Sequence, residues 1–265
     1  MKKLNFIIKY GLALLLLSFY SCESWLNVTP SDRLSEEMLF NDREGFVKAL
    51  NGVYIELNTN ELYGRNLTAG ALDVMGQYYS VASSSHAFYN YGGLVYTGND
   101  EKALFDNMWQ KCYAVIACCN TIIEKCDENK AGLSPVWRGS IKGEALALRA
   151  MLHFDMLRLF GPLTSELDKE SIPYQTNSDQ TVTPLLSGSE VIGLILDDLK
   201  NAVGLLKDTD PYFVEEEFSD TDLNYRRFRM NYFAAKGLMA RVQLWGGDKE
   251  KAAATAKEVI AEGQA

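Results

Sequence analysis

Histidine and positive charge are scarce in this 265-residue sequence. Two residues are histidine, and 26 Lys and Arg stand against 35 Asp and Glu, so the formal net charge is -9. A chain this acidic is repelled by phosphate backbones and by anionic lipid head groups. Nucleic-acid binding is therefore disfavoured from the outset.

Motifs that carry catalysis or hold cofactors are also missing. The sequence has no Gly-x-Ser-x-Gly, His-Glu-x-x-His, Gly-x-Gly-x-x-Gly or Walker loop. Of the two histidines, His86 falls in a predicted loop and His153 in a predicted buried helix, where a satisfied core histidine is the simpler interpretation. We therefore expect no catalytic residue, no metal ligand and no cofactor.

The N-terminal apolar run is too short to span a membrane. It covers residues 10–20, eleven residues, whereas a spanning helix needs roughly 20. Lys2 and Lys3 precede the run, and Ser21-Cys22 ends it, which is the pattern of a signal peptide over residues 1–21 with a bacterial lipobox. Cys22 is then the lipidated N-terminus of the mature protein, followed by a tether and extended start over residues 22–36. The alternative is ordinary secretion with an incidental cysteine.

The remaining cysteines do not form an obvious disulfide or zinc framework. Cys112, Cys118, Cys119 and Cys126 share one predicted helix, on which residues seven apart rise about 10 Å, too far for a bridge. No CxxC spacing or histidine cluster accompanies them. We expect them to face the core as small apolar side chains.

Apolar residues make up 47% of the sequence and recur at helical spacing along most of it. Asn41, with Glu44 three residues later, predicts the start of a helix whose apolar face includes Phe46, Leu50 and Val53. A second seam follows in steps of four and three residues. It consists of Phe105, Trp109, Cys112, Ile116, Cys119, Ile123 and Cys126.

Further helices are expected over residues 139–160, which are apolar on most sides, and after the capping box Ser187-x-x-Glu190. Residues 161–186 are expected to form a loop, and the acidic residues 215–222 a solvated linker. The last 34 or so residues predict a helical hairpin with a Gly-Asp turn, which resembles a tetratricopeptide unit. The predicted class is all-α, built from tetratricopeptide-like helical hairpins with long inserted loops.

Residues 58–100 differ, because turn-forming residues are too dense there for long helices, although residues 67–78 are compatible with one. Eight of the 14 tyrosines lie between Tyr54 and Tyr113. Tyrosine offers a flat apolar surface and a hydroxyl, which suits the apolar faces and polar rims of sugar rings. The alternative is that several of these rings pack the loop onto the helices. The candidate ligand-binding residues are Asp73, Gln77, Tyr78, Tyr79, Tyr89, Asn90, Tyr91 and Tyr96.

Four blocks in order resemble the SusD/RagB-like family. The first is Cys-Glu-Ser-Trp-Leu-Asn-Val-Thr-Pro at residues 22–30, and the second runs from Gly-Glu-Ala at residue 143 to Leu-Phe-Gly at residue 161. The third is Ile-Leu-Asp-Asp-Leu-Lys-Asn-Ala at residues 195–202, and the fourth is Ala-Lys-Gly-Leu-Met-Ala-Arg at residues 235–241. The loop after Gly161 departs from the family, since it lacks the usual Asp-x-Pro. We interpret Glu144, Arg149, Asp155 and Arg158 as structural, with Asp155 and Arg158 spaced to pair.

The resemblance implies an all-α nutrient-uptake lipoprotein of the outer membrane, facing the cell surface. Such proteins bind oligosaccharides, or peptides in RagB-like members, are not enzymes, and act with a SusC-like TonB-dependent transporter as partner. Residues 37–265 would be the N-terminal helical domain, without the C-terminal half of the family. The alternative function is a tetratricopeptide-type scaffold lipoprotein that binds a protein or peptide partner. An aromatic-lined cleft beside the helices favours nutrient binding, and an open concave helical groove favours the scaffold.

Overall fold

The computed structural model describes residues 36–179 and 181–264, and the chain divides into two units, residues 1–39 and 40–265. In the first unit the described part is the short helix α2 (Glu36–Leu39), so Glu36, which the prediction assigned to the extended start, is helical. The predicted signal peptide and Cys22 lie outside the described residues. Everything below concerns residues 40–265.

Helix α3 (Arg43–Leu57) begins one residue later than the sequence pattern indicated. Asp42, and not Asn41, is the N-cap, because its side chain accepts the backbone N–H of Gly45 at 2.8 Å. The predicted apolar face is confirmed, with Phe46, Leu50 and Val53 buried. This face packs against helices α6 and α7.

Helix α6 (Asn99–Glu128) carries all four of the internal cysteines. Cys112, Cys119 and Cys126 are buried in the predicted seam, and burial raises the pKa of the Cys126 thiol to about 12. The prediction is wrong for Cys118, which is exposed because it lies one residue off the seam.

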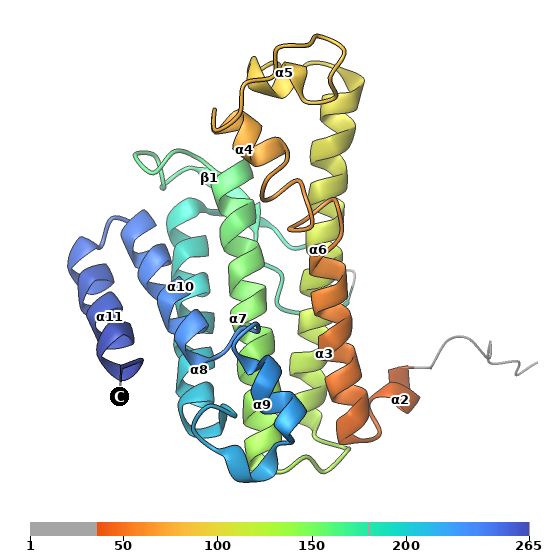
Figure 1. Ribbon diagram of the computed structural model, residues 1–265, viewed down its shortest axis with the longest axis vertical. Helices are drawn as coiled ribbons and strands as arrows, with labels where there is room; N and C mark the ends of the chain where they lie inside the picture. The colour runs from red at the N-terminus through yellow and green to blue at the C-terminus, as the bar shows by residue number, and fades with distance from the viewer. Residues whose placement is uncertain (1–35, 180, 265) are drawn as a thin grey trace, which may run out of the picture. The chain divides into compact units, whose positions relative to one another are not determined.

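Helix α7 (Pro135–Phe160) is the central element of the unit (Figure 1). Ser134 caps it and Pro135 occupies its first turn, so the helix starts four residues earlier than predicted. It packs against α6 on one side and α8 on the other. The approach to α8 is close, since a Cβ on Gly143 would lie 2.8 Å from Cγ of Leu206.

The segment between α7 and α8 is not only a loop. Strands β1 (Glu170–Pro173) and β2 (Leu185–Ser187) pair antiparallel within it, a small hairpin that the all-loop prediction missed. Strands of four and three residues are too short to show the alternation of apolar and polar residues that predicts a strand. Helix α8 (Gly188–Thr209) then starts at the predicted capping box, with Ser187 and Glu190 bonded reciprocally.

The C-terminal hairpin is confirmed as helices α10 (Tyr232–Trp245) and α11 (Lys249–Glu262). Asp248 caps α11, and Gly247 adopts a φ of 91°, which favours glycine in the turn. Helix α10 packs on α8 and α11 packs on α10, so the long helices continue one beside the next (Figure 1). In the described part of the chain, no helix is long and apolar enough to cross a membrane.

Short helices occupy the inserted segments. Residues 67–78 form only α4 (Ala71–Met75), which ends at Gly76, and α5 (Tyr89–Gly92) follows. The acidic linker is more ordered than predicted, with a 3-10 turn, η2 (Glu215–Glu217), and helix α9 (Asp220–Arg226). A reciprocal capping box between Ser219 and Asp222 starts α9, a local signal that the charge run concealed.

Candidate functional site

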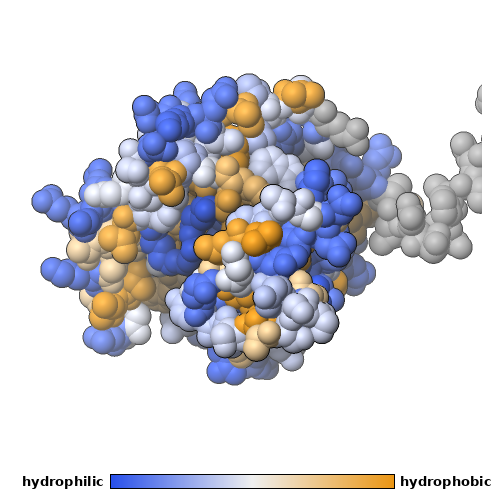
Figure 2. Space-filling model, turned by 90° about the horizontal axis from the view of Figure 1, so that it is seen from above, coloured by the Kyte–Doolittle hydropathy of each residue, from blue (hydrophilic) through white to orange (hydrophobic). Residues whose placement is uncertain are grey.

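The tyrosine-rich segment folds over one end of the long helices, with α4 and α5 in contact with each other (Figure 1). The Nε2 of Gln77 donates to the carbonyl oxygen of Gly92 at 3.0 Å and so joins the two arms of the segment. Seen from this end, hydrophobic residues form small patches between hydrophilic ones (Figure 2).

Tyr91 and Asn90 hold this segment in place. Tyr91 is 2% exposed and packs edge-on against Phe88 and Phe105. The amide of Asn90 donates to the carboxylate of Glu101 at 2.7 Å. Tyr91 and Asn90 therefore pack the loop onto the helices, which is the alternative interpretation given for this segment.

Two of the eight predicted residues meet at a hollow of about 470 Å³ beside α7, here called the Tyr78 hollow. Tyr78 is 79% exposed at its rim, and Asp73 lies on the neighbouring turn of α4. Tyr79, Tyr89 and Tyr96 are exposed but lie outside it. Apolar side chains complete the lining, namely Leu67, Leu72, Met151 and Leu238.

The charges of the Tyr78 hollow balance. Asp155 accepts the hydroxyl of Tyr63 at 2.6 Å and pairs with Arg158 at 3.1 Å, which confirms the predicted helical pair. Burial, together with the carboxylate of Asp155, raises the pKa of Tyr63 well above its ordinary value. Among the described residues, the side chains of Asp73 and Arg241 make no hydrogen bond or ion pair, so both are available to a ligand.

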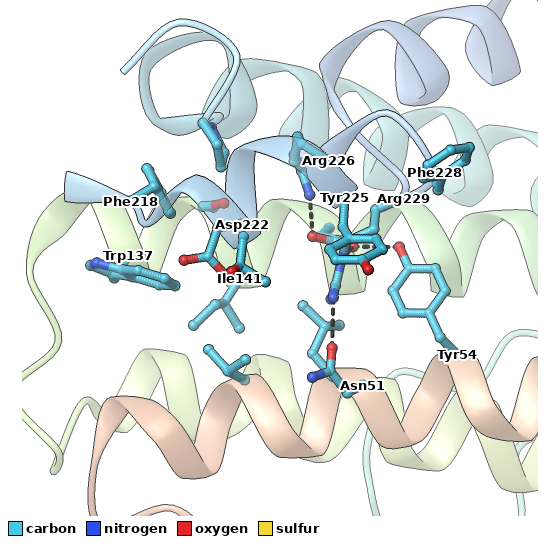
Figure 3. A pocket seen from close by; sticks show the side chains of 16 residues that line it. Asn51, Tyr54, Trp137, Ile141, Phe218, Asp222, Tyr225, Arg226, Phe228 and Arg229 are labelled. Atoms are coloured by element: carbon cyan, nitrogen blue, oxygen red, sulfur yellow. Dashed lines mark hydrogen bonds and ion pairs between the residues drawn. The ribbon is translucent and has the colours of Figure 1, made fainter. Parts of the chain in front are cut away.

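A second hollow of about 420 Å³ lies between α3, α7 and α9 and is here called the Phe228 hollow (Figure 3). Tyr225 and Phe228 stand at its rim, with Phe228 70% exposed. Trp137 also lines it, but the guanidinium of Arg43 lies 4.8 Å from that ring's centroid and Phe218 packs against it at 4.5 Å. The Trp137 indole therefore forms part of the wall of the hollow. The rings of Tyr225 and Phe228 are the accessible aromatic surfaces at its rim.

The floor of the Phe228 hollow is a buried ion network. Glu144 accepts hydrogen bonds from the Tyr54 hydroxyl and the Arg226 guanidinium, and from Arg229 Nε at 2.8 Å. Arg226 also holds Asp210 through Nε at 2.9 Å and Nη2 at 2.6 Å. Burial lowers the pKa of Arg226, but the two carboxylates outweigh it and the net pKa is raised. Arg226 therefore keeps its proton, and the network pairs two guanidinium groups with two carboxylates.

Three polar groups that line the Phe228 hollow keep unused hydrogen-bonding capacity. Ser140 is 5% exposed, and its hydroxyl has no partner among the described residues. Asn51 uses its oxygen to accept from Arg229 Nη1 at 2.6 Å, which leaves its own Nδ2 and the Nη2 of Arg229 without partners in the described part of the chain. These groups line the hollow, so each can form a hydrogen bond with a ligand there.

Between these two hollows lies a third, of about 370 Å³. It shares Tyr54, Phe228 and Arg229 with the Phe228 hollow, and it shares Tyr63 and Met151 with the Tyr78 hollow.

Sequence reasoning did not find the Phe228 hollow. The residues that bound it come from segments far apart in the chain, and Tyr225 and Phe228 follow directly after the acidic run that was interpreted as a solvated linker. The capping box of Ser219 and Asp222 was the one local signal that a helix begins there.

Residues 24–244 match the model of a SusD-like family described as starch-binding and associating with the outer membrane. The chain belongs to the SusD-like family.

Relatives of this SusD-like chain include two SusD-like proteins of Formosa agariphila. One is 26% identical, and the match covers 97% of this chain and 46% of the relative. The other is 27% identical, and the match covers 69% of this chain and 34% of the relative. The chain therefore spans about half the length, or less, of the curated relatives it matches.

Solved structures show the same fold. A SusD-like carbohydrate binding protein from Bacteroides vulgatus superposes with a TM-score of 0.66 at 24% identity, covering 84% of this chain and 45% of that one. A laminarin-binding SusD-like protein gives 0.60 at 17% identity, covering 83% and 43%. The all-α SusD-like class predicted from the sequence is confirmed.

The SusD-like blocks fall on buried polar networks. Besides Glu144, Arg149 binds Asp198 twice, through Nε and Nη2, each at 2.7 Å. His153 is fully buried, and its Nε2 accepts the backbone N–H of Gln175 at 3.0 Å, so the neutral ring carries its proton on Nδ1 and donates it to the Arg149 carbonyl. Burial lowers the pKa of His153 to about 3. In the part of the chain the structure describes, no cluster of His, Cys, Asp or Glu could hold a metal ion.

Proposed function

We propose that this SusD-like chain binds oligosaccharides at the cell surface as part of an outer-membrane lipoprotein. It captures the glycan at the Tyr78 hollow, performs no chemistry on it, and passes it to a SusC-like TonB-dependent transporter.

The observation that carries the proposal is the meeting of Tyr78 and Asp73 at one hollow. An exposed tyrosine ring beside an unpaired carboxylate offers an apolar face to a sugar ring and an acceptor to its hydroxyl groups. The hollow lies beside the helices and is bounded by an inserted loop, the arrangement that favours nutrient binding over a protein scaffold. The names of the relatives, which include carbohydrate- and laminarin-binding proteins, support the same ligand class.

Replacing Tyr78 with alanine is expected to weaken glycan binding by about 1 to 3 kcal/mol, because a stacked ring loses its apolar contact. Titration calorimetry of the purified chain with maltoheptaose and with laminarihexaose measures this. Tyr212→Ala is the matched control, since Tyr212 is exposed but lies outside the Tyr78 hollow. A change below about threefold for Tyr78→Ala, roughly 0.65 kcal/mol, would place the site elsewhere.

The proposed anchor gives a separate test. Mass spectrometry of protein extracted from membranes is expected to show an acylated peptide that starts at Cys22, because the charged start, the apolar run and the Ser21-Cys22 junction form a lipobox pattern. Two or three acyl chains hold a protein stably on a bilayer, at ~0.8 kcal/mol for each buried CH₂. An unmodified peptide that spans Ser21 and Cys22 in the mature protein argues against the anchor.

A further inference from the structure

The three hollows lie in sequence along α7. The Phe228 hollow is lined by Ser140 and Glu144 of this helix, the middle hollow by Leu148 and Met151, and the Tyr78 hollow by Met151 onward to Arg158. Each end hollow shares lining side chains with the middle one, so neighbouring hollows abut along α7 and are bounded from each other by these shared side chains. They form one groove, here called the α7 groove.

The length of the α7 groove suits a chain-like ligand. Ser140 in the Phe228 hollow and Asp155 in the Tyr78 hollow are fifteen residues apart, which is about 22 Å along a helix. Accessible aromatic surfaces stand at both ends, Tyr78 at one and Tyr225 with Phe228 at the other. A monosaccharide reaches one of these surfaces, whereas an oligosaccharide reaches both.

The charge of the lining favours a neutral ligand. Although the whole chain carries a net charge of -9, each end hollow has two carboxylates and two guanidinium groups. A charged polymer gains no net attraction from such a lining. The free groups, the hydroxyl of Ser140 and the amide of Asn51 among them, are neutral hydrogen-bonding partners of the kind that sugar hydroxyls use.

The walls of the groove offer no sheet edge to an extended peptide. One mode of peptide recognition adds an extended peptide to such an edge through backbone hydrogen bonds. The groove is walled mainly by helices α3, α7, α9 and α10, whose interior backbone groups bond within each helix, so recognition falls to side chains. A helical peptide needs a continuous apolar groove, and here charged and polar groups interrupt the lining at both ends.

We propose that the α7 groove binds one neutral oligosaccharide chain along its length, with Tyr225, Phe228 and Ser140 forming a second contact region for the glycan held at Tyr78. The proposal rests on the glycan-binding function proposed above and extends its site from one hollow to three. It predicts that longer glycans bind more tightly than shorter ones, because a longer glycan also contacts the Phe228 hollow.

The test compares short and long glycans on single variants by titration calorimetry. The probes are maltotriose with maltoheptaose, and laminaribiose with laminarihexaose. The longer probe of the pair that binds is expected to bind about tenfold more tightly than the shorter one. Phe228→Ala is expected to remove that gain and leave the short probe unchanged, and Ser140→Ala to weaken the long probe about threefold. Phe228 is mostly exposed and Ser140→Ala is a small change, so both variants keep the fold. Tyr212→Ala is the control and retains the length dependence.

The possible results separate the two proposals. If Tyr78→Ala weakens both probes while Phe228→Ala, Tyr225→Ala and Ser140→Ala change neither, the glycan-binding function stands and the long groove is wrong. If Phe228→Ala weakens the short probe as much as the long one, the groove does not extend from Tyr78. If no neutral oligosaccharide of either length binds, or if only peptides from hydrolysed casein bind and the same variants weaken them, both proposals are overturned.

Discussion

Replacing Arg226 with methionine is expected to lower the free energy of unfolding by about 3 to 5 kcal/mol, because it leaves two buried carboxylates without their shared cation. Asp210 is fully buried and Glu144 nearly so, and Arg226 bonds to both. Removing the guanidinium changes a balanced cluster into one with a net negative charge. Urea unfolding at neutral pH, followed by circular dichroism, measures the loss.

The neighbour Arg227 provides the matched control. Its side chain is exposed and lies over the ring of Phe228, with no carboxylate partner among the described residues. Arg227→Met is therefore expected to change stability by no more than about 0.5 kcal/mol. Arg226→Lys keeps the charge but loses the paired hydrogen bonds to Asp210, and an intermediate loss is expected. Equal urea midpoints for Arg226→Met and Arg227→Met would show that the network contributes nothing.

Acid is expected to destabilise the protein through His153. Burial lowers the pKa of this histidine from 6.5 to about 3, so between these values the unfolded chain binds a proton that the folded chain does not. The stability contribution is therefore fully present above pH 6.5 and is lost as pH falls from there towards 3. The loss between pH 7 and pH 5 is about 2 kcal/mol.

The measurement compares urea unfolding at the two pH values for the natural chain and for His153→Gln. The variant is less stable at both, but its decrease from pH 7 to pH 5 is expected to be about 2 kcal/mol smaller, because glutamine does not titrate. Comparing decreases removes the contribution of the carboxylates that both proteins share. His86→Gln changes the histidine of the exposed loop and is expected to keep the natural decrease. An identical decrease in all three proteins would mean that His153 takes up its proton without unfolding the chain.

Local patterns predicted the helices well. The capping box of Ser187 and Glu190, the cap at Asp248 and the seam through Cys112 and Cys119 all appear where the sequence placed them. Each signal lies within a few residues of the backbone groups it satisfies or the face it buries, so it acts before any tertiary contact forms. The errors were local as well. Asp42 replaced Asn41 as a cap, and the acidic run hid the helix that starts after Ser219.

The candidate site was predicted only in part. Composition alone drew attention to the tyrosines of residues 73–99, but it did not distinguish Tyr91, which is buried, from Tyr78, which stands at the rim of a hollow. Both have the same side chain and similar neighbours in sequence. Their difference arises because Tyr91 packs against Phe105 on α6, a contact between segments that only the folded chain brings together.

The sequence by itself determined the helical class, the caps of α8 and α11 and the membership of the SusD-like family, since these depend on residue type and on spacing along a few turns. The tertiary structure decided which charges meet and where the surface is hollow. Glu144 and Arg226 are 82 residues apart, and no local rule pairs them. The α7 groove likewise exists because α3, α9 and α10 lie beside the same helix, and the position of each depends on the packing of all the others.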